Sequence, residues 1–521
     1  MDNFVTASII TKFKRHSGIV AGFGVVLCTF LPLSVLAKNT DVFTQYPLEL
    51  SFNLTQPALI VNLSPLPGNE LVLIGMDEQQ RRTVAIYAFK QASDTFIELD
   101  KFILPDNVFA YDFGELQQDR LQHLYFLDKS AVSRYVPAHL SHPSKLIEAE
   151  QVKSMYLSDS AQSLKQVDFA QDINNDGMDD IILSDFEHLN LWLSDCCGAR
   201  HAQRLPIAAR LEINESSVNY DDQDIYFADM NGDKQTDLVT VEQGKLKVYE
   251  QNSDKQFSAL PKNIPINKAI YGLNWWDMRG PNDQEMDQSN IKHRKVKGIE
   301  DFNADGIPDL AVEFTNSAGV LDKTIDYEFF YGEFNEGKLR FSEQASTSIT
   351  SDDTLSNLSF LDINMDGKKE VAVSSFDIGI SQIVSALLSG SIDQDVLIFS
   401  MDGNNQFSKT PIVSQEVEIT FSLTSGTRGQ PLVKMVDVNG DKFKDIVFSD
   451  SDDVIRTLLA TPNNAKAYAR RSLKQKVALP KNPSDATAQD INADDKTDLI
   501  LHYGSADNAE DLKRLLVLMA N

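Results

Sequence analysis

The amino-acid sequence predicts an all-β protein, a β-propeller of about eight four-stranded blades, with seven blades as the alternative. Three observations predict this fold. An acidic nonapeptide recurs six times, with starts 53 to 75 residues apart. Short runs rich in Val, Ile, Leu and Phe lie on both sides of each copy, and further runs of this kind follow. Helical periodicity is nearly absent apart from SQIVSALLSG at 381–390.

The acidic nonapeptide is expected to be the turn between two strands, because short apolar runs bounded by turn residues are typical of strands. The runs that follow it include DIILS, DLVTV and EVAVSS. The six copies are DINNDGMDD from Asp172, DMNGDKQTD from Asp229, DFNADGIPD from Asp301, DINMDGKKE from Asp362, DVNGDKFKD from Asp437 and DINADDKTD from Asp490.

A third strand and often a fourth are expected after each copy. After the second strand of the Asp172 repeat they are LNLWLS and the region around RLPIAARLEI, and in the Asp301 repeat they are IDYEFFYGEF and KLRFSEQ. Two weaker repeats precede the six: ALIVNLSPLPGNELVLIGM has no acidic loop, and FAYDFGELQQDRLQHLYFLD keeps only Asp112 of the pattern. The last repeat has three clear strands, and YPLELSFNL near the N-terminus is expected to supply its fourth. Pairing of the two chain ends would close the ring and hide its sheet edges.

The first nonapeptide offers a set of oxygen ligands suited to Ca²⁺, a hard cation that takes six to eight oxygens. Side-chain oxygens stand at positions 1, 3, 5 and 9 and a backbone carbonyl at position 7, from Asp172, Asn174, Asp176, Asp180 and Met178. Gly177 at position 6 permits the positive φ of a sharp turn. An EF-hand is excluded, since its loop has 12 residues and lies between helices.

Some copies depart from this pattern at single positions. Glu370 replaces Asp at position 9 and keeps a carboxylate there. Lys234, Lys442 and Asp495 occupy position 6, where Gly is easiest, so these three loops are expected to be weaker sites.

Charge supports a structural metal and argues against nucleic-acid binding. The 521 residues carry 76 acidic and 48 basic side chains, a formal net charge of −28, whereas nucleic-acid-binding surfaces are basic. Each loop crowds three carboxylates together, which repel one another without a cation. About six structural Ca²⁺ ions are therefore expected.

The first 37 residues predict a secretory signal peptide cleaved after Ala37, with a basic start and the apolar stretch 19–36. An uncleaved anchor and a lipid on Cys28 are the alternatives. No second stretch is long enough to span a membrane, so residues 38–521 are expected to form one exported domain, periplasmic, at the cell surface or extracellular. Cys196 and Cys197 then form either a vicinal disulfide or two thiols in a turn.

The repeats resemble the FG-GAP/VCBS family of calcium-binding propellers, found in integrin α-subunits and bacterial exported proteins, most strongly over 165–505. The Phe-Gly and Gly-Ala-Pro elements that name the family are mostly missing here. The resemblance implies that positions 1, 3, 5, 7 and 9 of every loop are calcium ligands. Besides those of the first loop, they are Asp229, Asn231, Asp233, Gln235, Asp237, Asp301, Asn303, Asp305, Ile307, Asp309, Asp362, Asn364, Asp366, Lys368, Glu370, Asp437, Asn439, Asp441, Phe443, Asp445, Asp490, Asn492, Asp494, Lys496 and Asp498.

The segment 271–297 is the main candidate for ligand binding, since a long polar insertion between blades holds two of the chain's three Trp residues. Trp275 and Trp276, with Asp277 and Arg279, would suit a sugar ring or a peptide. Arg428 lies at a similar blade junction two repeats later. The alternative is that the two Trp rings plug the junction between blades.

No catalytic motif with specific spacing is present: the sequence lacks HExxH, GxSxG and a P-loop. Two classes of function remain. The first is a non-catalytic binding or adhesion module for a glycan or a protein, expected to be a monomer. The second is a polysaccharide lyase-like enzyme on a calcium-binding propeller, which would need His and Tyr to converge with Arg279 or Arg428.

Overall fold

The computed structural model describes residues 41–117, 120–155, 164–195, 199–213, 218–278, 290–319, 322–351, 353–376, 389–421, 428–461 and 467–521. The predictions for the signal peptide, Cys28, Cys196, Cys197, Arg279 and most of the helical segment at 381–390 lie outside these residues. The chain divides into Met1–Thr40 and Asp41–Asn521, and everything below concerns the second unit. Within the described ranges, no helix is long and apolar enough to cross a membrane.

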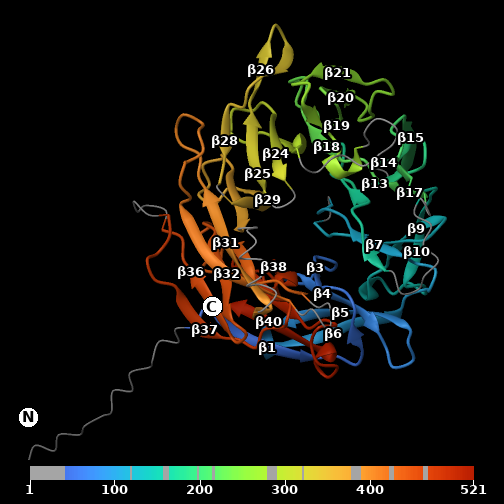
Figure 1. Cartoon of the computed structure of the whole chain (residues 1–521). Coiled ribbons are helices and arrows are strands. Elements are labelled where there is room, and N and C mark those ends of the chain that lie inside the picture. The colour runs from blue at the N-terminus through green and yellow to red at the C-terminus, as the bar shows by residue number, and fades with distance from the viewer. Residues whose placement is uncertain are drawn as a thin grey trace, which may run out of the picture. The chain divides into compact units, whose positions relative to one another are not determined.

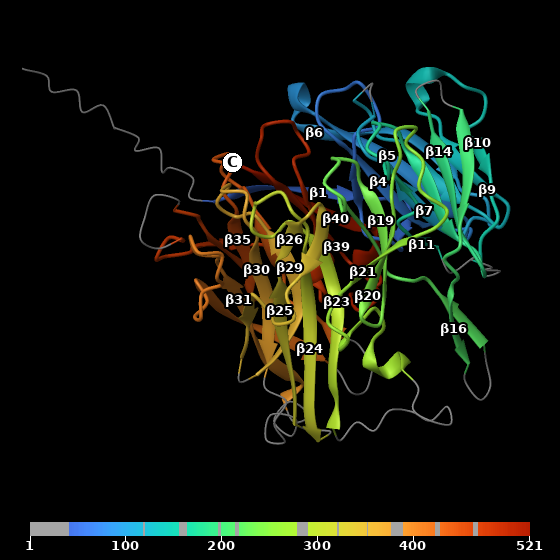
Figure 2. The ribbon, with the colours of Figure 1, turned by 90° about the horizontal axis from the view of Figure 1, so that it is seen from above.

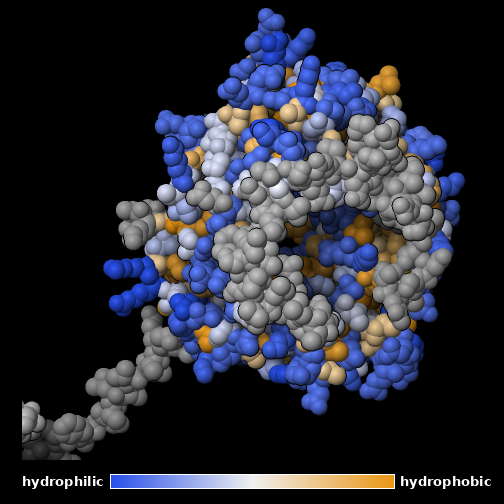
Figure 3. All heavy atoms as spheres, in the orientation of Figure 1, coloured by the Kyte–Doolittle hydropathy of each residue, from blue (hydrophilic) through white to orange (hydrophobic). Residues whose placement is uncertain are grey.

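The unit Asp41–Asn521 is a ring of eight β-sheets, so the prediction of a propeller is confirmed and the count is eight, not seven (Figure 1). In the same orientation, the space-filling view shows this face hollowed near its centre (Figure 3). We number the blades along the chain. Blade 1 contains β2 (Asn53–Leu54), β3 (Leu59–Val61), β4 (Glu70–Met76), β5 (Arg82–Lys90) and β6 (Thr95–Ile103). Blade 2 contains β7 (Ala110–Phe113), β8 (Leu124–Leu127), β9 (Ala131–Tyr135), β10 (Leu146–Gln151) and β11 (Lys165–Gln166). Blade 3 contains β12 (Ala170–Gln171), β13 (Asp180–Ser184), β14 (Leu189–Ser194) and β15 (Arg200–Leu205).

The next three blades follow the same order of strands. Blade 4 contains β18 (Ile225–Ala228), β19 (Asp237–Glu242), β20 (Lys245–Tyr249) and β21 (Lys262–Pro265). Blade 5 contains β22 (Ile270–Tyr271), β23 (Lys292–Glu300), β24 (Asp309–Gly319), β25 (Asp322–Phe330) and β28 (Thr347–Ile349). Blade 6 contains β29 (Thr354–Leu361), β30 (Glu370–Phe376), β31 (Ser391–Phe399), β32 (Val413–Phe421) and β33 (Arg428–Gly429).

Two blades, two inserted hairpins and short 3₁₀ turns complete the domain. Blade 7 contains β34 (Val433–Val436), β35 (Asp445–Ser451), β36 (Val454–Leu458) and β37 (Leu473–Lys476). Blade 8 contains β38 (Thr487–Gln489), β39 (Asp498–His502), β40 (Arg514–Ala520) and β1 (Phe43–Glu49). The hairpins are β16 (Arg210–Ile213) with β17 (Val218–Asp221), and β26 (Gly332–Asn335) with β27 (Lys338–Phe341). The 3₁₀ turns are η1 (Gln91–Ser93), η2 (Ala138–Leu140), η3 (Trp275–Asp277), η6 (Pro483–Asp485) and η7 (Asp511–Lys513).

The N-terminal strand closes the ring, as the sequence predicts. β1 pairs antiparallel with β40 in a register that runs from Phe43 opposite Ala520 to Glu49 opposite Arg514. Blade 8 therefore takes three strands from the C-terminus and one from the start of the domain. Because β1 covers β40, the last sheet does not end on the final strand of the chain.

The two predicted fourth strands are partly wrong. KLRFSEQ does not complete blade 5: it forms β27, which pairs with β26, and β28 is the strand next to β25. The reason is a two-residue turn, Glu336-Gly337, where φ is 52° and 74°; positive φ at both positions matches a hairpin turn that closes locally. Likewise the RLEI segment forms β16 of a hairpin, and β15 is the fourth strand of blade 3.

The hydrophobic core lies between successive blades. The second strand of a blade has a neighbour on both faces, which explains its continuous apolar sequence: β13 is buried along its whole length, and β4 is buried except at Met76. One cluster joins Phe52 and Leu73 of blade 1 to Ile500 and Val517 of blade 8. Packing of this kind across the two chain ends holds the ring together beyond the pairing of β1 with β40.

Candidate metal loops and an exposed aromatic pair

The six acidic loops occupy equivalent places in the fold. In blades 3, 4, 6, 7 and 8 the loop connects the first and second strands, and in blade 5 it connects β23 and β24, because the short strand β22 precedes them. Since the blades share one orientation around the ring, the loops lie on one face of the domain, called the loop face below. The loops are 172–180, 229–237, 301–309, 362–370, 437–445 and 490–498.

Backbone hydrogen bonds wind each loop around its side-chain oxygens. In blade 5, Asp301 at position 1 accepts hydrogen bonds from the backbone N–H groups of Asp305 at 3.1 Å and Gly306 at 2.7 Å. Asn303 at position 3 accepts a second bond from Asp305 at 2.9 Å. Equivalent bonds hold Asp437 and Asp490 in their loops. The predicted ligands at positions 1, 3 and 5 therefore face the inside of a tight turn.

Positive φ angles recur at position 6, as the glycine in half of the copies indicates. Lys234 has φ of 70°, Lys442 of 74° and Asp495 of 64°, close to the 82° of Gly306. These three non-glycine residues are therefore strained at position 6, but Gly232 and Gly440 occupy position 4 in two of the three loops, so the expectation that these loops are weaker stays a prediction. Position 4 also has a positive φ, for example 62° at Ala304, a feature that sequence analysis missed.

The acid at position 9 has a structural role that sequence analysis did not predict. Asp309 is fully buried. One of its oxygens accepts the N–H of Phe302 at 3.1 Å, and the other accepts the N–H of Gly332 at 2.8 Å. The carboxylate thus ties the start of the loop to the end of the third strand. The same pair of bonds is made by Asp237, Asp445 and Asp498.

Three buried oxygens in these loops have no hydrogen-bond partner, and they fit a cation. They are Oδ1 of Asn174 at position 3, Oδ2 of Asp180 at position 9 and Oδ1 of Asp362 at position 1. A buried oxygen without a donor costs free energy, whereas a bound Ca²⁺ would satisfy it. The donor set, hard oxygens from carboxylate, carboxamide and carbonyl groups, also fits calcium.

The carboxylates alone do not make a closed site. Among the described residues, no three His, Cys, Asp or Glu side chains are gathered closely enough to hold a metal ion. A calcium ion in these loops would therefore depend on the Asn and carbonyl oxygens as well as on the acids.

Burial raises the pKa of every acid at position 9, and the charges at positions 1 and 5 of the same loop add to the effect in most of them. The pKa is about 8 for Asp180, about 7 for Asp309, Glu370 and Asp498, and about 6 for Asp237 and Asp445. The ionised forms are destabilised because three negative charges share a small and partly dry space.

These pKa values predict that the calcium-free protein becomes more stable in mild acid. The unfolded chain releases these protons near pH 4, whereas the folded chain keeps them to about pH 6–8. Between those limits the folded state binds more protons, so stability falls as the pH rises. In excess EDTA, the melting temperature should therefore increase between about pH 8 and about pH 6. With calcium bound the trend should reverse, because protons compete with the metal. A chelated protein whose melting temperature fell on acidification would contradict this.

The two Trp residues lie on the opposite side of the domain from the acidic loops. Trp275 and Trp276 are in η3, which follows β22 and precedes the start of β23, whereas the acidic loop of blade 5 follows the end of β23. Figure 2 shows η3, the β16–β17 hairpin and the tip of β24 on this same side of the ring. We call this side the aromatic face.

The Trp pair is not buried in a blade junction. Trp276 is 54% exposed and Trp275 is partly exposed. Their ring centroids are 5.2 Å apart at an interplanar angle of 86°, an edge-to-face arrangement. Lys323 Nζ lies 5.6 Å from the centroid of the Trp275 ring. The alternative interpretation, rings that plug the junction, predicts buried side chains and does not match this exposure.

Polar contacts fix the turn that carries the Trp pair. Asp277 accepts a bond from Arg210 of β16 at 3.1 Å and one from the side chain of Asn274 at 2.8 Å. Beneath the turn, Lys295 Nζ bonds Oδ1 of Asn274 at 3.0 Å, and Nε2 of the buried His293 lies 2.7 Å from the Leu273 carbonyl. Asp277, predicted as a ligand contact, is thus engaged in an ion pair that holds η3.

The other predicted ligand residues are placed only in part. Arg279 lies outside the described residues. Arg428 belongs to β33, which pairs with β32 opposite Phe421, and its side chain is not among those described. The lyase-like alternative depends on these two arginines and stays a prediction.

Comparison with known proteins gives a fold likeness only. No family model matches the sequence, and no curated protein matches it. The structure is similar to that of BBS1N in complex with ARL6DN, with a TM-score of 0.34 and 12% identity over 92% of this chain and 97% of that chain. It is also similar to an Agrocybe aegerita lectin structure on recognition of non-reducing terminal N-acetylglucosamine, with a TM-score of 0.34 and 10% identity over 86% of this chain and 85% of that chain. The class that fold and sequence define here is an eight-bladed β-propeller with six acidic loops.

Proposed function

We propose that residues 38–521 are an exported, calcium-stabilised propeller of the FG-GAP/VCBS type that acts as a non-catalytic binding module for a glycan or a protein. The observation that carries the proposal is the exposed, edge-to-face pair of Trp275 and Trp276. Exposed Trp side chains on a firmly held turn are the groups that most often anchor a ligand at a protein surface.

The contacts that hold the Trp pair in place explain why the pair suits ligand binding. An aromatic side chain on a loose loop loses conformational freedom when it binds, and this cost lowers affinity. Here the Asp277–Arg210 ion pair, with Arg210 only 20% and Asp277 only 7% exposed, holds the turn to the β16–β17 hairpin. His293 and Lys295 hold it to blade 5. The two Trp side chains therefore lose little conformational freedom when a ligand binds.

In this proposal the two faces of the domain have different roles. Calcium in the acidic loops stabilises the blades from the loop face, and the opposite face is free to bind. The single strand β23 connects the two, since its start lies under the Trp pair and its end leads into the loop at Asp301.

Replacement of both Trp residues by Ala tests the proposal. Binding of the mature protein to a printed glycan array and to immobilised extracellular proteins, in calcium, should fall at least about tenfold for the hits that the native protein gives. The free energy of unfolding should change by only about 0.5 kcal/mol, because the side chains are exposed. Leu260→Ala is the matched control: Leu260 is 79% exposed, and it lies on the loop side of blade 4, between β20 and β21.

Two results would reject the Trp pair as the binding surface. One is unchanged binding by the double variant. The other is a large loss of stability in that variant, since removal of a buried Trp costs about 3–5 kcal/mol. The expected binding can also be followed by fluorescence, because two of the three Trp residues of the chain belong to the pair.

A further inference from the structure

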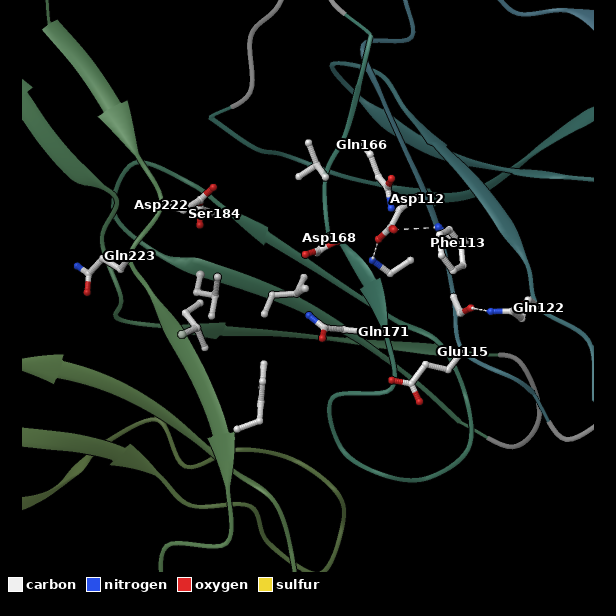
Figure 4. A pocket seen from close by; sticks show the side chains of 17 residues that line it. Asp112, Phe113, Glu115, Gln122, Gln166, Asp168, Gln171, Ser184, Asp222 and Gln223 are labelled. Atoms are coloured by element: carbon white, nitrogen blue, oxygen red, sulfur yellow. Dashed lines mark hydrogen bonds between the residues drawn. The ribbon is translucent and has the colours of Figure 1, made fainter. Parts of the chain in front are cut away.

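A cavity of about 650 Å³ lies between the first strands of blades 2, 3 and 4. Its walls come from β7, β11, β12, β13, β14 and β18 and from segments next to them (Figure 4). A volume of this size is typical of sites for small molecules. The cavity is separate from the Trp pair, whose residues do not line it.

The polar part of the cavity wall is acidic or neutral. The described lining residues include four carboxylates and four carboxamides, and none of those described is Lys, Arg or His. These polar residues are Asp112, Glu115, Asp168, Asp222, Gln122, Gln166, Gln171 and Gln223. Negative charge without a basic neighbour in the wall favours a ligand that is positively charged.

Some of these groups are already used by the fold, and others are open. Asp112 is buried, and one of its oxygens accepts the N–H groups of Phe169 and Ala170, both at 2.7 Å. Asp168, by contrast, is exposed, and it has no hydrogen-bond or ion-pair partner among the described residues. Its charge contributes to the raised pKa of Asp112, about 7, which is caused mainly by burial. The carboxylate of Asp168 is thus a solvent-exposed charge at the cavity, without a cationic partner among the described residues.

Next to these polar groups the cavity has an apolar surface. Ile182, Leu189, Ile225 and Phe227 contribute it from blades 3 and 4. Figure 4 shows Asp168, Gln171 and Glu115 along one wall, with Asp222 and Gln223 on the facing segment. A ligand that fits this surface has cationic groups separated by aliphatic carbon.

We propose that this cavity binds a linear aliphatic polyamine, with one ammonium group at Asp168, another toward Glu115, and the methylene chain against the half-buried Ile225 and Phe227. A divalent metal fits less well, because Ca²⁺ needs six to eight oxygens around one point, whereas the carboxylates here are spread over two facing walls of the cavity (Figure 4). A neutral sugar would leave the charge of Asp168 uncompensated. This site is independent of the binding surface proposed above.

Calorimetric titration of the calcium-saturated mature protein with spermidine tests the proposal at physiological ionic strength. We expect saturable binding that Asp168→Asn weakens about tenfold, since a hydrogen bond between two charged groups is stronger than one to a neutral acceptor. Triacetylated spermidine, which lacks the charges, should not bind. Asp452→Asn is the matched control, because the Asp452 side chain is 95% exposed and far along the chain in blade 7.

The outcomes distinguish binding of spermidine at this cavity from nonspecific attraction of a polycation to an acidic protein. Equal weakening by Asp168→Asn and Asp452→Asn, or no effect of Asp168→Asn, would overturn the proposal. So would loss of spermidine binding when free calcium is raised well above loop saturation, since that result would identify a divalent-cation site. The Trp275→Ala/Trp276→Ala variant should bind spermidine as the native protein does, so failure of one proposal is distinguishable from failure of the other.

Discussion

Removal of calcium with EDTA is expected to lower the melting temperature of the mature protein by about 10 °C or more. The reason is the arrangement of the six acidic loops. Each places two acids at a tight turn and a third, buried acid at position 9, and the pKa of that third acid is raised because its charge is costly. A bound Ca²⁺ would offset the repulsion and supply a partner for oxygens such as Oδ1 of Asn174, which lack one.

The size of the effect follows from binding linkage. At a free calcium concentration of about 100 times the dissociation constant, one site that exists only in the folded state adds about 2.7 kcal/mol. Several such sites in one cooperative ring would together exceed the net stability of many domains, about 5–15 kcal/mol. Differential scanning calorimetry with and without EDTA, together with elemental analysis for about six Ca²⁺ per chain, measures this.

Variants of single loops separate metal binding from general charge effects. Asp301→Asn with Asp305→Asn replaces two proposed carboxylate ligands of one loop with neutral carboxamides, keeps the shape of the side chains and should reduce the bound calcium by about one ion. Asp450→Asn with Asp453→Asn removes the same charge from blade 7 outside the loops and should leave the calcium content unchanged. A melting temperature insensitive to EDTA, with no calcium found by elemental analysis, would contradict the proposed role of the loops.

The fold could be predicted from the sequence because both the acidic loop and the apolar runs beside it recur along the chain. Loops of fixed length force a turn at the same point of every blade, so strands such as β13 and β35 were found from the apolar runs that follow a loop. Blade 1 was found without any acidic loop, from strand patterns alone. Its Glu70 occupies the place of the position 9 acid: it is buried and accepts the N–H of Leu63 at 2.8 Å. Ser64, in the place of position 3 where the six acidic loops have Asn, donates to the same carboxylate.

What sequence analysis missed depends on contacts between distant segments. The second bond of Asp309 comes from Gly332, after the third strand, and no spacing rule predicts it. The partner of Asp277 is Arg210, which lies 67 residues earlier in an inserted hairpin. The cavity at Asp168 is likewise assembled from three blades. Local patterns predict elements and loops, whereas these sites arise only when the ring closes.

Loss of the closing strand is expected to have the largest effect of any local change. A variant that lacks residues 41–49 should fail to reach the native fold, because β40 would keep β39 but lose β1, and this would expose a hydrophobic sheet edge. Phe43 is the main side chain of this closure: it is 1% exposed and belongs to a cluster with Leu432 and Leu518. Its backbone N–H and carbonyl also bond the buried side chain of Gln475 in blade 7, at 2.9 Å and 2.6 Å.

Phe43→Ala tests the closure without removal of the strand, and it should lower the free energy of unfolding by about 3–5 kcal/mol. Thr44→Ala, at the next and exposed position of β1, should change it by only about 0.5 kcal/mol. Urea unfolding followed by tryptophan fluorescence measures both. For the variant that lacks residues 41–49, a synthetic peptide of that sequence added in trans should restore a monomeric elution volume by pairing with β40. Native stability of the shortened chain without the peptide would show that the other blades close the ring on their own.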